Sequence, residues 1–284
     1  MITASQLLTQ GAATKDGVLV DAPWLAEHLS DPTVRVVEVD VNRAAYDQWH
    51  IDGAVLWNLY QDLKDANYRP VDSLTLARLI GRSGIAPDTT VVFYGYAPAM
   101  GFWLMKLLGH ADVRILDCSR DAWRSCGHSV STSPTVRAPV EYPSGEPNGD
   151  LRAGHPEVAE AIGAPGVVIL DVRSDAEYRG ERFWPSGGLD PIGRAGHVPS
   201  AVHQPLDGIL DQKGSFRSAP ALRRLLSSID LDGDGKLITY CTIGGRACTA
   251  WFVLSQLLGR EGVRVYDGSW AEWGRLPETP VDRA

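Results

Sequence analysis

The chain has 284 residues, of which 44% are hydrophobic and 22% charged, and its formal net charge is −8. This composition is that of an ordinary globular protein and excludes a disordered or fibrous chain. At about 150 residues per domain, the length predicts about two domains. The acidic balance argues against nucleic acid or an anionic membrane surface as the main partner, because the overall field would repel both.

No stretch of the sequence approaches the ~20 apolar residues that span a bilayer. The segment Met1–Val20 lacks the basic start and the apolar stretch of a secretory signal. Four cysteines (Cys118, Cys126, Cys241 and Cys248) are too few for a disulfide framework in a chain of this length. We therefore expect reduced thiols and a cytoplasmic protein without membrane attachment.

The first half of the chain alternates short β-branched runs with helical stretches. Val36–Val41 (VVEVDV) is followed by His50–Val55 (HIDGAV). Val91–Gly95 (VVFYG) is followed by an apolar stretch and by VRILDCSRDAW, which ends at Trp123. Apolar runs of this kind are typical of buried strands. Strands alternating with helices predict an α/β fold, with a mostly parallel sheet covered by helices on both faces.

A proline-rich segment with scattered serine and glycine follows at Ser129–Asp150. Such a composition is typical of a semi-extended linker. We therefore expect one domain at residues 1–128, a linker at 129–150 and a second domain at 151–284.

The second half repeats the pattern of the first. Val167–Val172 (VVILDV) is followed by HVPSAV, and Leu237–Cys241 (LITYC) by an apolar stretch and VRVYDGSWAEW. We predict strands at these two runs and helices at Ala221–Ile229 and Thr249–Leu258. Two diverged copies of one unit, a tandem duplication, are therefore expected.

The copies differ in length between corresponding residues. Ten positions separate Asp40 from His50, whereas 26 separate Asp171 from His197, so the second copy carries an insertion of 16 residues there.

The main chemical signal is Cys241–Arg246 (CTIGGR), between a predicted strand and a predicted helix. Gly244 and Gly245 allow a tight turn in which backbone N–H groups point inward. A cysteine at the mouth of such a loop would have a stabilised thiolate, and Arg246 would offer a fixed charge to an oxyanion. The competing interpretation is a buried, inert cysteine at a strand end.

With this loop, three further motifs make the chain resemble the rhodanese family, the two-domain thiosulfate sulfurtransferases. They are Leu170–Arg173 (LDVR), Gly196–Ala201 (GHVPSA) and Tyr266–Trp270 (YDGSW), and the resemblance covers roughly residues 18–280. It implies two rhodanese-like domains, and a Cys241 that takes the outer sulfur of thiosulfate as a persulfide. The acceptor would be cyanide, a thiol or a thioredoxin-like protein, and neither a metal nor an organic cofactor would be needed.

The resemblance also assigns roles within the two copies. Gly95 stands where the second copy has Cys241, and Tyr96–Met100 holds neither cysteine nor arginine, so the first copy is expected to be inactive. In the second copy, Asp171 and Arg173 would support the loop through hydrogen bonds and a charge pair. The alternative for these two is a helix-capping aspartate with a surface arginine.

The sequence departs from the family pattern at Glu177, where the vertebrate thiosulfate enzymes have an arginine. We therefore expect Arg246 to bind the sulfite part of the donor, with the insertion residues Arg179, Arg182 and Arg194 as weaker candidates. His197 is expected to be a structural hydrogen-bonding residue rather than a base.

Alternative activities remain at this point. Ile243 stands where the mercaptopyruvate branch carries a serine, which favours thiosulfate over 3-mercaptopyruvate. Phosphatases of this fold have five residues between cysteine and arginine, whereas only four, Thr242, Ile243, Gly244 and Gly245, stand here. A non-catalytic sulfur-carrier or protein-binding module would be expected to have lost the cysteine, the glycines or the arginine.

Overall fold

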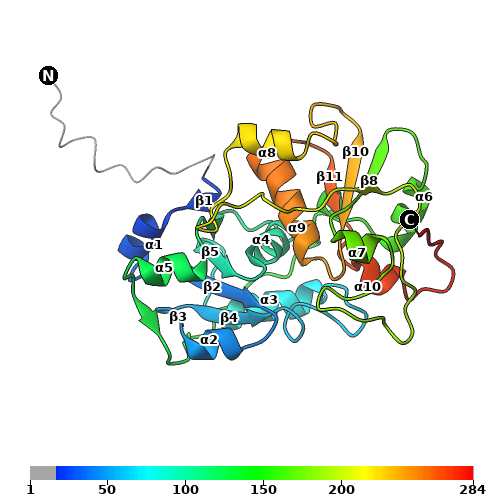
Figure 1. Cartoon of the computed structure of the whole chain (residues 1–284). Coiled ribbons are helices and arrows are strands. Elements are labelled where there is room, and N and C mark those ends of the chain that lie inside the picture. Colours follow the sequence, from blue (N-terminus) through cyan, green and yellow to red (C-terminus); the bar gives the residue numbers. More distant parts are fainter. Residues whose placement is uncertain (1–16, 284) are drawn as a thin grey trace, which may run out of the picture.

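The computed structural model describes residues 17–283 (Figure 1). The first 16 residues of the predicted first domain, and with them most of Met1–Val20, lie outside the described residues, as does Ala284. The described part contains two parallel sheets flanked by helices, one in each half of the chain. The predicted α/β class and the duplication are both confirmed.

The first sheet has five parallel strands in the order β1-β6-β5-β2-β4. Their bounds are Leu19–Val20, Val113–Leu116, Thr90–Gly95, Val34–Asp40 and Val55–Asn58. The helices of this copy are α1 (Ala22–His28), α2 (Ala44–Gln48), α3 (Ser73–Arg82), α4 (Pro98–Leu107) and α5 (Arg120–Ser125). The central strands β2 and β5 are almost wholly buried. β5 is a near-continuous apolar run, as expected of a parallel sheet covered on both faces, whereas β2 also buries the carboxyl groups of Glu38 and Asp40.

The second sheet has four parallel strands in the order β11-β10-β8-β9. Their bounds are Val263–Val265, Lys236–Tyr240, Val167–Asp171 and Val202–His203. The helices are α6 (His155–Ala161), α7 (Asp175–Tyr178), α8 (Ala219–Leu225), α9 (Gly245–Trp251) and α10 (Ser269–Trp273), with a 3-10 turn at Gly149–Leu151.

Two predicted helices have different bounds in the structure. The helix expected at Thr249–Leu258 begins earlier, at Gly245, and continues as a π-helix over Phe252–Leu257. The helix expected at Ala221–Ile229 is α8, which begins and ends earlier, at Ala219 and Leu225. Its proline lies in the first turn, where a missing N–H leaves no hydrogen bond unmade.

The predicted linker is extended but lies against the first copy. β7 (Val130–Ser131) pairs antiparallel with β3 (His50–Ile51). Further along, the Val140 N–H donates to the Gly81 carbonyl (3.0 Å) and the Asn148 N–H donates to the Leu107 carbonyl (2.8 Å). The segment therefore satisfies part of its backbone on the first domain rather than in solvent.

The two copies share one hydrophobic core across α4 and α9, which lie side by side at the centre of the molecule (Figure 1). Phe102 of α4 packs edge-on against Phe252 at 4.9 Å between ring centroids, and Trp251 lies at 6.2 Å. This packing fixes the position of one copy relative to the other. Within residues 17–283, no helix is long and apolar enough to cross a membrane.

Candidate functional site

Cys241 follows β10 directly, at the point where the chain turns toward α9, and its side chain is buried. Gly244 is left-handed (φ +92°), which returns the backbone so that its N–H donates to Cys241 Sγ at 3.1 Å. A Cβ at this position would lie 2.8 Å from the Asp267 carbonyl oxygen. Glycine is therefore required there. An N–H aimed at the sulfur favours the thiolate over the thiol.

The start of α10 holds the loop from one side. The Cys241 N–H donates to Ser269 Oγ (3.1 Å), and the Trp270 N–H donates to the Cys241 carbonyl (2.9 Å). The Ala271 N–H donates to the Thr242 carbonyl (2.8 Å). The motif Tyr266–Trp270 therefore reaches the loop through its backbone and one hydroxyl. Sequence reasoning singled out this motif but did not predict the contact of Ser269.

Glu177 holds the loop from the other side. It is fully buried and accepts from Arg246 Nη2 (2.8 Å) and Thr242 Oγ1 (2.5 Å) on one oxygen, and from Arg246 Nη1 (2.9 Å) on the other. Ser174 donates to the second oxygen as well, through its hydroxyl (2.7 Å) and its N–H. Burial alone would raise the pKa of Glu177, but Arg246, Thr242 and Ser174 outweigh it and bring the pKa to about 2.

The structure explains why the chain departs from the family pattern at Glu177. The residue is the partner of the loop arginine, which sequence reasoning missed. A local signal existed, because Ser174 and Glu177 form a capping box at the start of α7. Arg246 is thereby fixed in a bidentate geometry, with its side chain 32% exposed.

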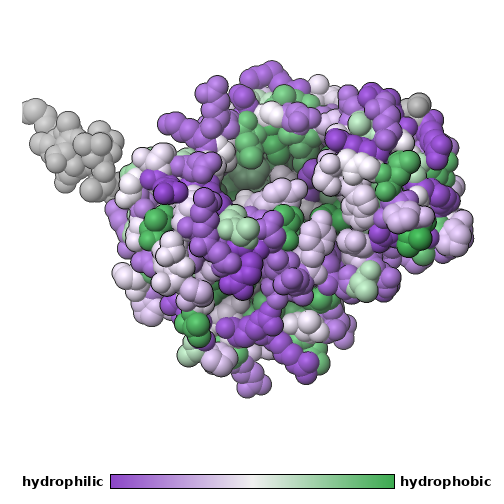
Figure 2. Space-filling model, turned by 60° about the horizontal axis from the view of Figure 1, so that its bottom comes forward, coloured by the Kyte–Doolittle hydropathy of each residue, from purple (hydrophilic) through white to green (hydrophobic). Residues whose placement is uncertain are grey.

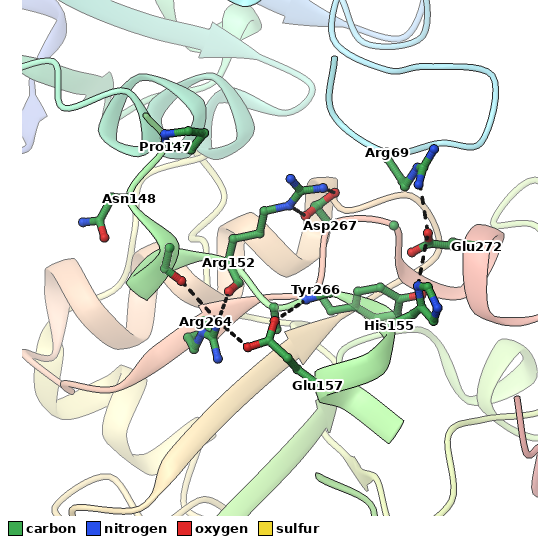
Figure 3. A pocket seen from close by; sticks show the side chains of 14 residues that line it. Arg69, Pro147, Asn148, Arg152, His155, Glu157, Arg264, Tyr266, Asp267 and Glu272 are labelled. Atoms are coloured by element: carbon green, nitrogen blue, oxygen red, sulfur yellow. Dashed lines mark hydrogen bonds and ion pairs between the residues drawn. The ribbon is translucent and has the colours of Figure 1, made fainter. Parts of the chain in front are cut away.

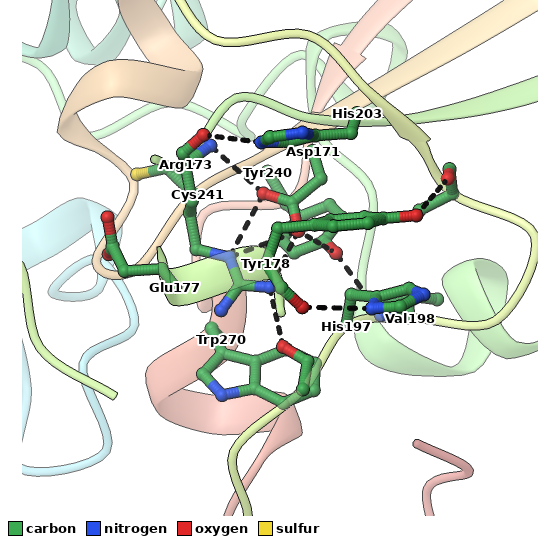
Figure 4. Close-up of polar contacts among 12 residues, drawn as sticks. Asp171, Arg173, Glu177, Tyr178, His197, Val198, His203, Tyr240, Cys241 and Trp270 are labelled. Carbon is green, nitrogen blue, oxygen red and sulfur yellow. Dashed lines mark hydrogen bonds and ion pairs between the residues drawn. The ribbon is translucent and has the colours of Figure 1, made fainter. Parts of the chain in front are cut away.

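Asp171 and Arg173 form a fully buried charge pair behind the loop (Figure 4). Arg173 Nη2 donates to Asp171 Oδ2 (2.6 Å) and to the Gly196 carbonyl (2.7 Å), and its guanidinium lies 4.5 Å from the Trp270 ring. The Tyr240 hydroxyl donates to Asp171 (2.5 Å). The pair thus contacts the residues on either side of the loop, Tyr240 and Trp270. A capping aspartate with a surface arginine is wrong here.

Tyr240 links the Asp171–Arg173 pair to Cys241, which is the next residue in the chain. Burial and the Asp171 carboxylate raise the pKa of Tyr240 well above its ordinary value, so the hydroxyl keeps its proton and donates it. The Val198 N–H donates to the same hydroxyl at 3.1 Å. The strand end before Cys241 is therefore fixed from two directions.

A cleft of about 730 Å³ opens between the copies at Cys241. The second copy contributes Cys241, Ile243, Gly245, Arg246 and Thr249, and the first copy contributes Val41, Asn42, Leu59, Tyr60, Tyr96 and Ala97. Trp184, Pro185 and Ser186 of the insertion complete the lining. In Figure 2, one face of the molecule has a hollow where hydrophobic residues gather, bordered by hydrophilic ones. The cleft is large enough for a small anion and an acceptor.

The three insertion arginines are engaged elsewhere. Arg179 pairs with Glu181 (2.8 Å) on the surface, and Arg182 donates to the Ser174 hydroxyl (2.9 Å). Arg194 donates to the Thr279 carbonyl (2.6 Å) near the end of the chain. None of the three lines the cleft described above, so the structure gives these weaker candidates no support as donor-binding residues. The insertion instead contributes Trp184 to the cleft, and no sequence pattern marked this residue as functional.

His197 has the structural surroundings expected of it, and Cys248 lies in the core. His197 Nδ1 is 3.0 Å from the Tyr178 carbonyl, and its ring stacks on Tyr178, which is a structural role (Figure 4). Cys248 is fully buried in the core shared by the two copies. Within residues 17–283, no three His, Cys, Asp or Glu side chains gather in a way that could hold a metal ion.

Comparison with known proteins agrees with this geometry. The family model "Rhodanese-like domain" matches twice, at residues 21–126 and 155–276. A protein of Mycolicibacterium smegmatis named "Putative thiosulfate sulfurtransferase" is 37% identical over 94% of this chain and 98% of its own. A protein of Haloferax volcanii with the same name is 37% identical over 94% of this chain and 96% of its own.

Solved structures show the same fold. The anaerobic ergothioneine biosynthesis enzyme from Chlorobium limicola, solved with trimethyl histidine, superimposes with a TM-score of 0.84. It is 24% identical, and the match covers 95% of this chain and 71% of that one. The wild-type structure of EanB gives a TM-score of 0.83 at 23% identity, over 98% and 72% of the two chains. The two family matches, together with relatives of this similarity, show that the chain belongs to the rhodanese family and is a sulfurtransferase.

Proposed function

We propose that this protein transfers the outer sulfur of thiosulfate to a thiophilic acceptor through a persulfide on Cys241. The observation that carries the proposal is the Gly244 N–H, 3.1 Å from Cys241 Sγ, in a loop that opens on the cleft between the copies. Relatives covering nearly the whole chain carry the name of this activity. The residues 151–284 would be the catalytic copy, 129–150 the linker and 1–128 the inactive copy.

The reaction would proceed by two nucleophilic displacements. The Cys241 thiolate attacks the outer sulfur of thiosulfate, the S–S bond of the donor breaks, and sulfite leaves with the electron pair. The acceptor, for example cyanide, then attacks the outer sulfur of the persulfide, and the thiolate of Cys241 is restored as thiocyanate leaves. Neither step moves a proton or needs an oxidant, so the chain has to supply only anion stabilisation and positioning.

The loop would supply that stabilisation. In a buried site, the Gly244 N–H acts on a thiolate or persulfide with little competition from water. Arg246 lines the same cleft, and Glu177 holds it in place, so its exposed part is oriented toward the sulfite end of a donor. Thr242, Ile243 and Gly245 would complete the loop. Asp171 and Arg173 would position its Cys241 end, because they contact Tyr240 and Trp270.

The lining of the cleft supports one donor over the other. Ile243 lines the cleft with an apolar side chain that cannot hydrogen-bond a carboxylate, which supports thiosulfate over 3-mercaptopyruvate as donor. Cyanide, a small thiol or a thioredoxin-like protein would serve as acceptor. The four unpaired cysteines fit a reducing cytoplasm.

The test is the intact mass of the reduced protein before and after incubation with thiosulfate. The parent protein should gain one sulfur atom, and cyanide should remove it. Cys241→Ser should gain none, whereas Cys126→Ser, which removes an exposed thiol of the first copy, should behave as the parent. A parent that gains no sulfur overturns thiosulfate as donor, and a gain that survives in Cys241→Ser overturns the assigned cysteine.

A further inference from the structure

A lysine of the first copy lies buried beneath the loop of the second. Lys64 belongs to the segment between β4 and α3 and is only 5% exposed. Its Nζ donates to the Asp267 carbonyl at 2.8 Å. A Cβ built on Gly244 would lie 3.1 Å from the same Nζ, so the ammonium group packs directly on the glycine whose N–H reaches Cys241 Sγ.

A buried ammonium group is unfavourable unless negative charge lies nearby. Burial lowers the pKa of Lys64, and the charges of Asp267 and of an ionised Cys241 offset only part of this effect. The fold therefore keeps a cation in a position where burial works against it and anions favour it. One of those anions is the thiolate on which the proposed reaction depends.

The carboxylate of Asp267 does not cancel this charge. Arg152 Nε donates to Asp267 Oδ1 at 2.7 Å, and the two side chains face each other in the pocket beside the loop (Figure 3). Arg152, Asp267 and Lys64 together carry one net positive charge. It is the backbone carbonyl of Asp267, not its carboxylate, that accepts from Lys64.

Arg246 is the second cation near Cys241, and a carboxylate neutralises its charge. Arg246 feels the charge of Cys241, but both of its terminal nitrogens donate to the Glu177 carboxylate. Two further titratable neighbours of Cys241, Tyr60 from the first copy and Cys248 from α9, are neutral in their ordinary forms. The surplus positive charge at the loop therefore comes from the side of Lys64.

We propose that Lys64 is a positioning residue for Cys241: its ammonium packs against Gly244 and stabilises the thiolate and the persulfide from the inner side of the loop. This inference rests on the proposed persulfide function. It gives the first copy a part in the reaction, because the catalytic loop of the second copy lacks this charge without it.

The test is the pH dependence of alkylation at Cys241 in the full chain. Iodoacetamide reacts with the thiolate, and the tryptic peptide Leu237–Arg246 contains Cys241 as its one cysteine, so mass spectrometry reads this residue alone. In Lys64→Met and Lys64→Gln, the midpoint of the rate profile should rise by about one pH unit, as for loss of one nearby opposite charge. Lys64→Gln keeps a donor for the Asp267 carbonyl, so it separates charge from hydrogen bonding.

Two controls frame the result. Lys64→Arg keeps the charge and should restore the midpoint of the parent. Lys106→Met makes the same change at a half-buried lysine of α4, whose Nζ donates to the His110 carbonyl, and should leave the midpoint unchanged. Equal midpoints in the parent and both neutral Lys64 variants would overturn the proposal.

A reciprocal measurement leaves Lys64 intact and serves where the neutral variants do not fold. Coupling between two charges is the same from either side, so Cys241→Ser should lower the titration midpoint of the Lys64 ammonium, followed by NMR of labelled lysine side chains. An unchanged Lys64 midpoint overturns the coupling. A parent protein that never forms the persulfide would instead overturn the proposed function, so the two failures are distinguishable.

Discussion

The same junction, from a central strand to a central helix, is built differently in the two copies. In the first copy, two residues, Tyr96 and Ala97, join β5 to α4. Both of their N–H groups donate to the Val39 carbonyl of the neighbouring strand, at 2.9 and 3.2 Å. The next residue is Pro98, which has no N–H.

In the second copy, four residues, Cys241 to Gly244, join β10 to α9. The added length lets the backbone turn back, so that the Gly244 N–H donates to Cys241 Sγ instead of to a strand. The comparison shows that duplication of the fold preserved the strand and the helix but not the free donors. Anion chemistry therefore depends on where the N–H groups of this junction point.

The largest effect on activity is expected at one of the two junction glycines, Gly244 and Gly95, and not at the other. Gly244 and Gly95 both have positive φ, and a Cβ at either would lie 2.8 Å from a carbonyl oxygen. Alanine at position 244 keeps the N–H, but its Cβ forces the backbone to shift and turns that N–H away from Cys241 Sγ. Gly244→Ala should therefore reduce the rate of persulfide formation by about 100-fold, the scale of losing one anion-binding donor. Gly95→Ala should destabilise the protein by about 1–3 kcal/mol, from backbone strain, without slowing the chemistry of the folded molecules.

The two variants are compared by urea unfolding and by the rate of sulfur gain, normalised to folded protein. Similar losses of stability with a large rate difference would support the comparison. A Gly95→Ala variant whose folded molecules form the persulfide 100-fold more slowly would show that the first junction takes part in the chemistry.

A smaller effect is expected at the carboxylate that holds the loop. Glu177→Gln keeps the shape but removes the charge that fixes Arg246, so we expect about 2 kcal/mol less stability at pH 7. We also expect about a tenfold lower kcat/KM for thiosulfate, because the loop is less firmly positioned. Glu181→Gln removes a surface partner of Arg179 on the same segment and should change neither quantity.

The stability of the protein in acid tests the same Glu177–Arg246 ion pair. The pKa of Glu177 is about 2 in the folded protein and 4.5 in its ordinary state, so its contribution to stability is present above pH 4.5 and lost as the pH falls through 2. The parent should lose this part of its stability in acid, and Glu177→Gln should lack it. Parallel acid profiles in the two proteins would contradict the assigned ion pair.

The sequence was sufficient for features encoded in contiguous residues. The β-branched runs such as Val167–Val172 predicted strands, and the loop Cys241–Arg246 predicted a turn with an inward N–H. Such patterns are local, since period and glycine placement specify the backbone. The start of α9 was missed because Gly244 and Gly245 weaken any helix pattern, although the left-handed Gly244 is what begins it.

The supports of the loop could not be predicted in the same way. Ser269 reaches it from the next strand–helix connection, and Lys64 from the other copy, far away in sequence. Their contacts depend on how the two copies pack through α4 and α9, which no local pattern encodes. Arg194 is an expected site residue that lies elsewhere, where it donates to the Thr279 carbonyl. The sequence of an insertion does not show whether an arginine faces a cleft or binds backbone carbonyls.

The smallest expected effect on activity lies at a buried carboxylate of the first copy. Glu38 is fully buried, accepts from the Tyr94 hydroxyl and lies 3.2 Å from Arg120 Nε. Burial raises the pKa of Glu38 to about 7, against the opposing effects of Tyr94 and Arg120. This is the reverse of Glu177, whose partners outweigh its burial.

The sign of the pH dependence is reversed accordingly. A raised carboxyl pKa means that the contribution of Glu38 to stability is present below pH 4.5 and lost as the pH rises through 7, an effect of about 3 kcal/mol. Glu38→Gln should remove this decline and leave sulfur gain unchanged, since Glu38 does not line the cleft at Cys241. Urea unfolding at several pH values decides it. A parent profile without the decline would mean that Arg120 neutralises Glu38 as fully as Arg246 neutralises Glu177, and the contrast between the two carboxylates would then disappear.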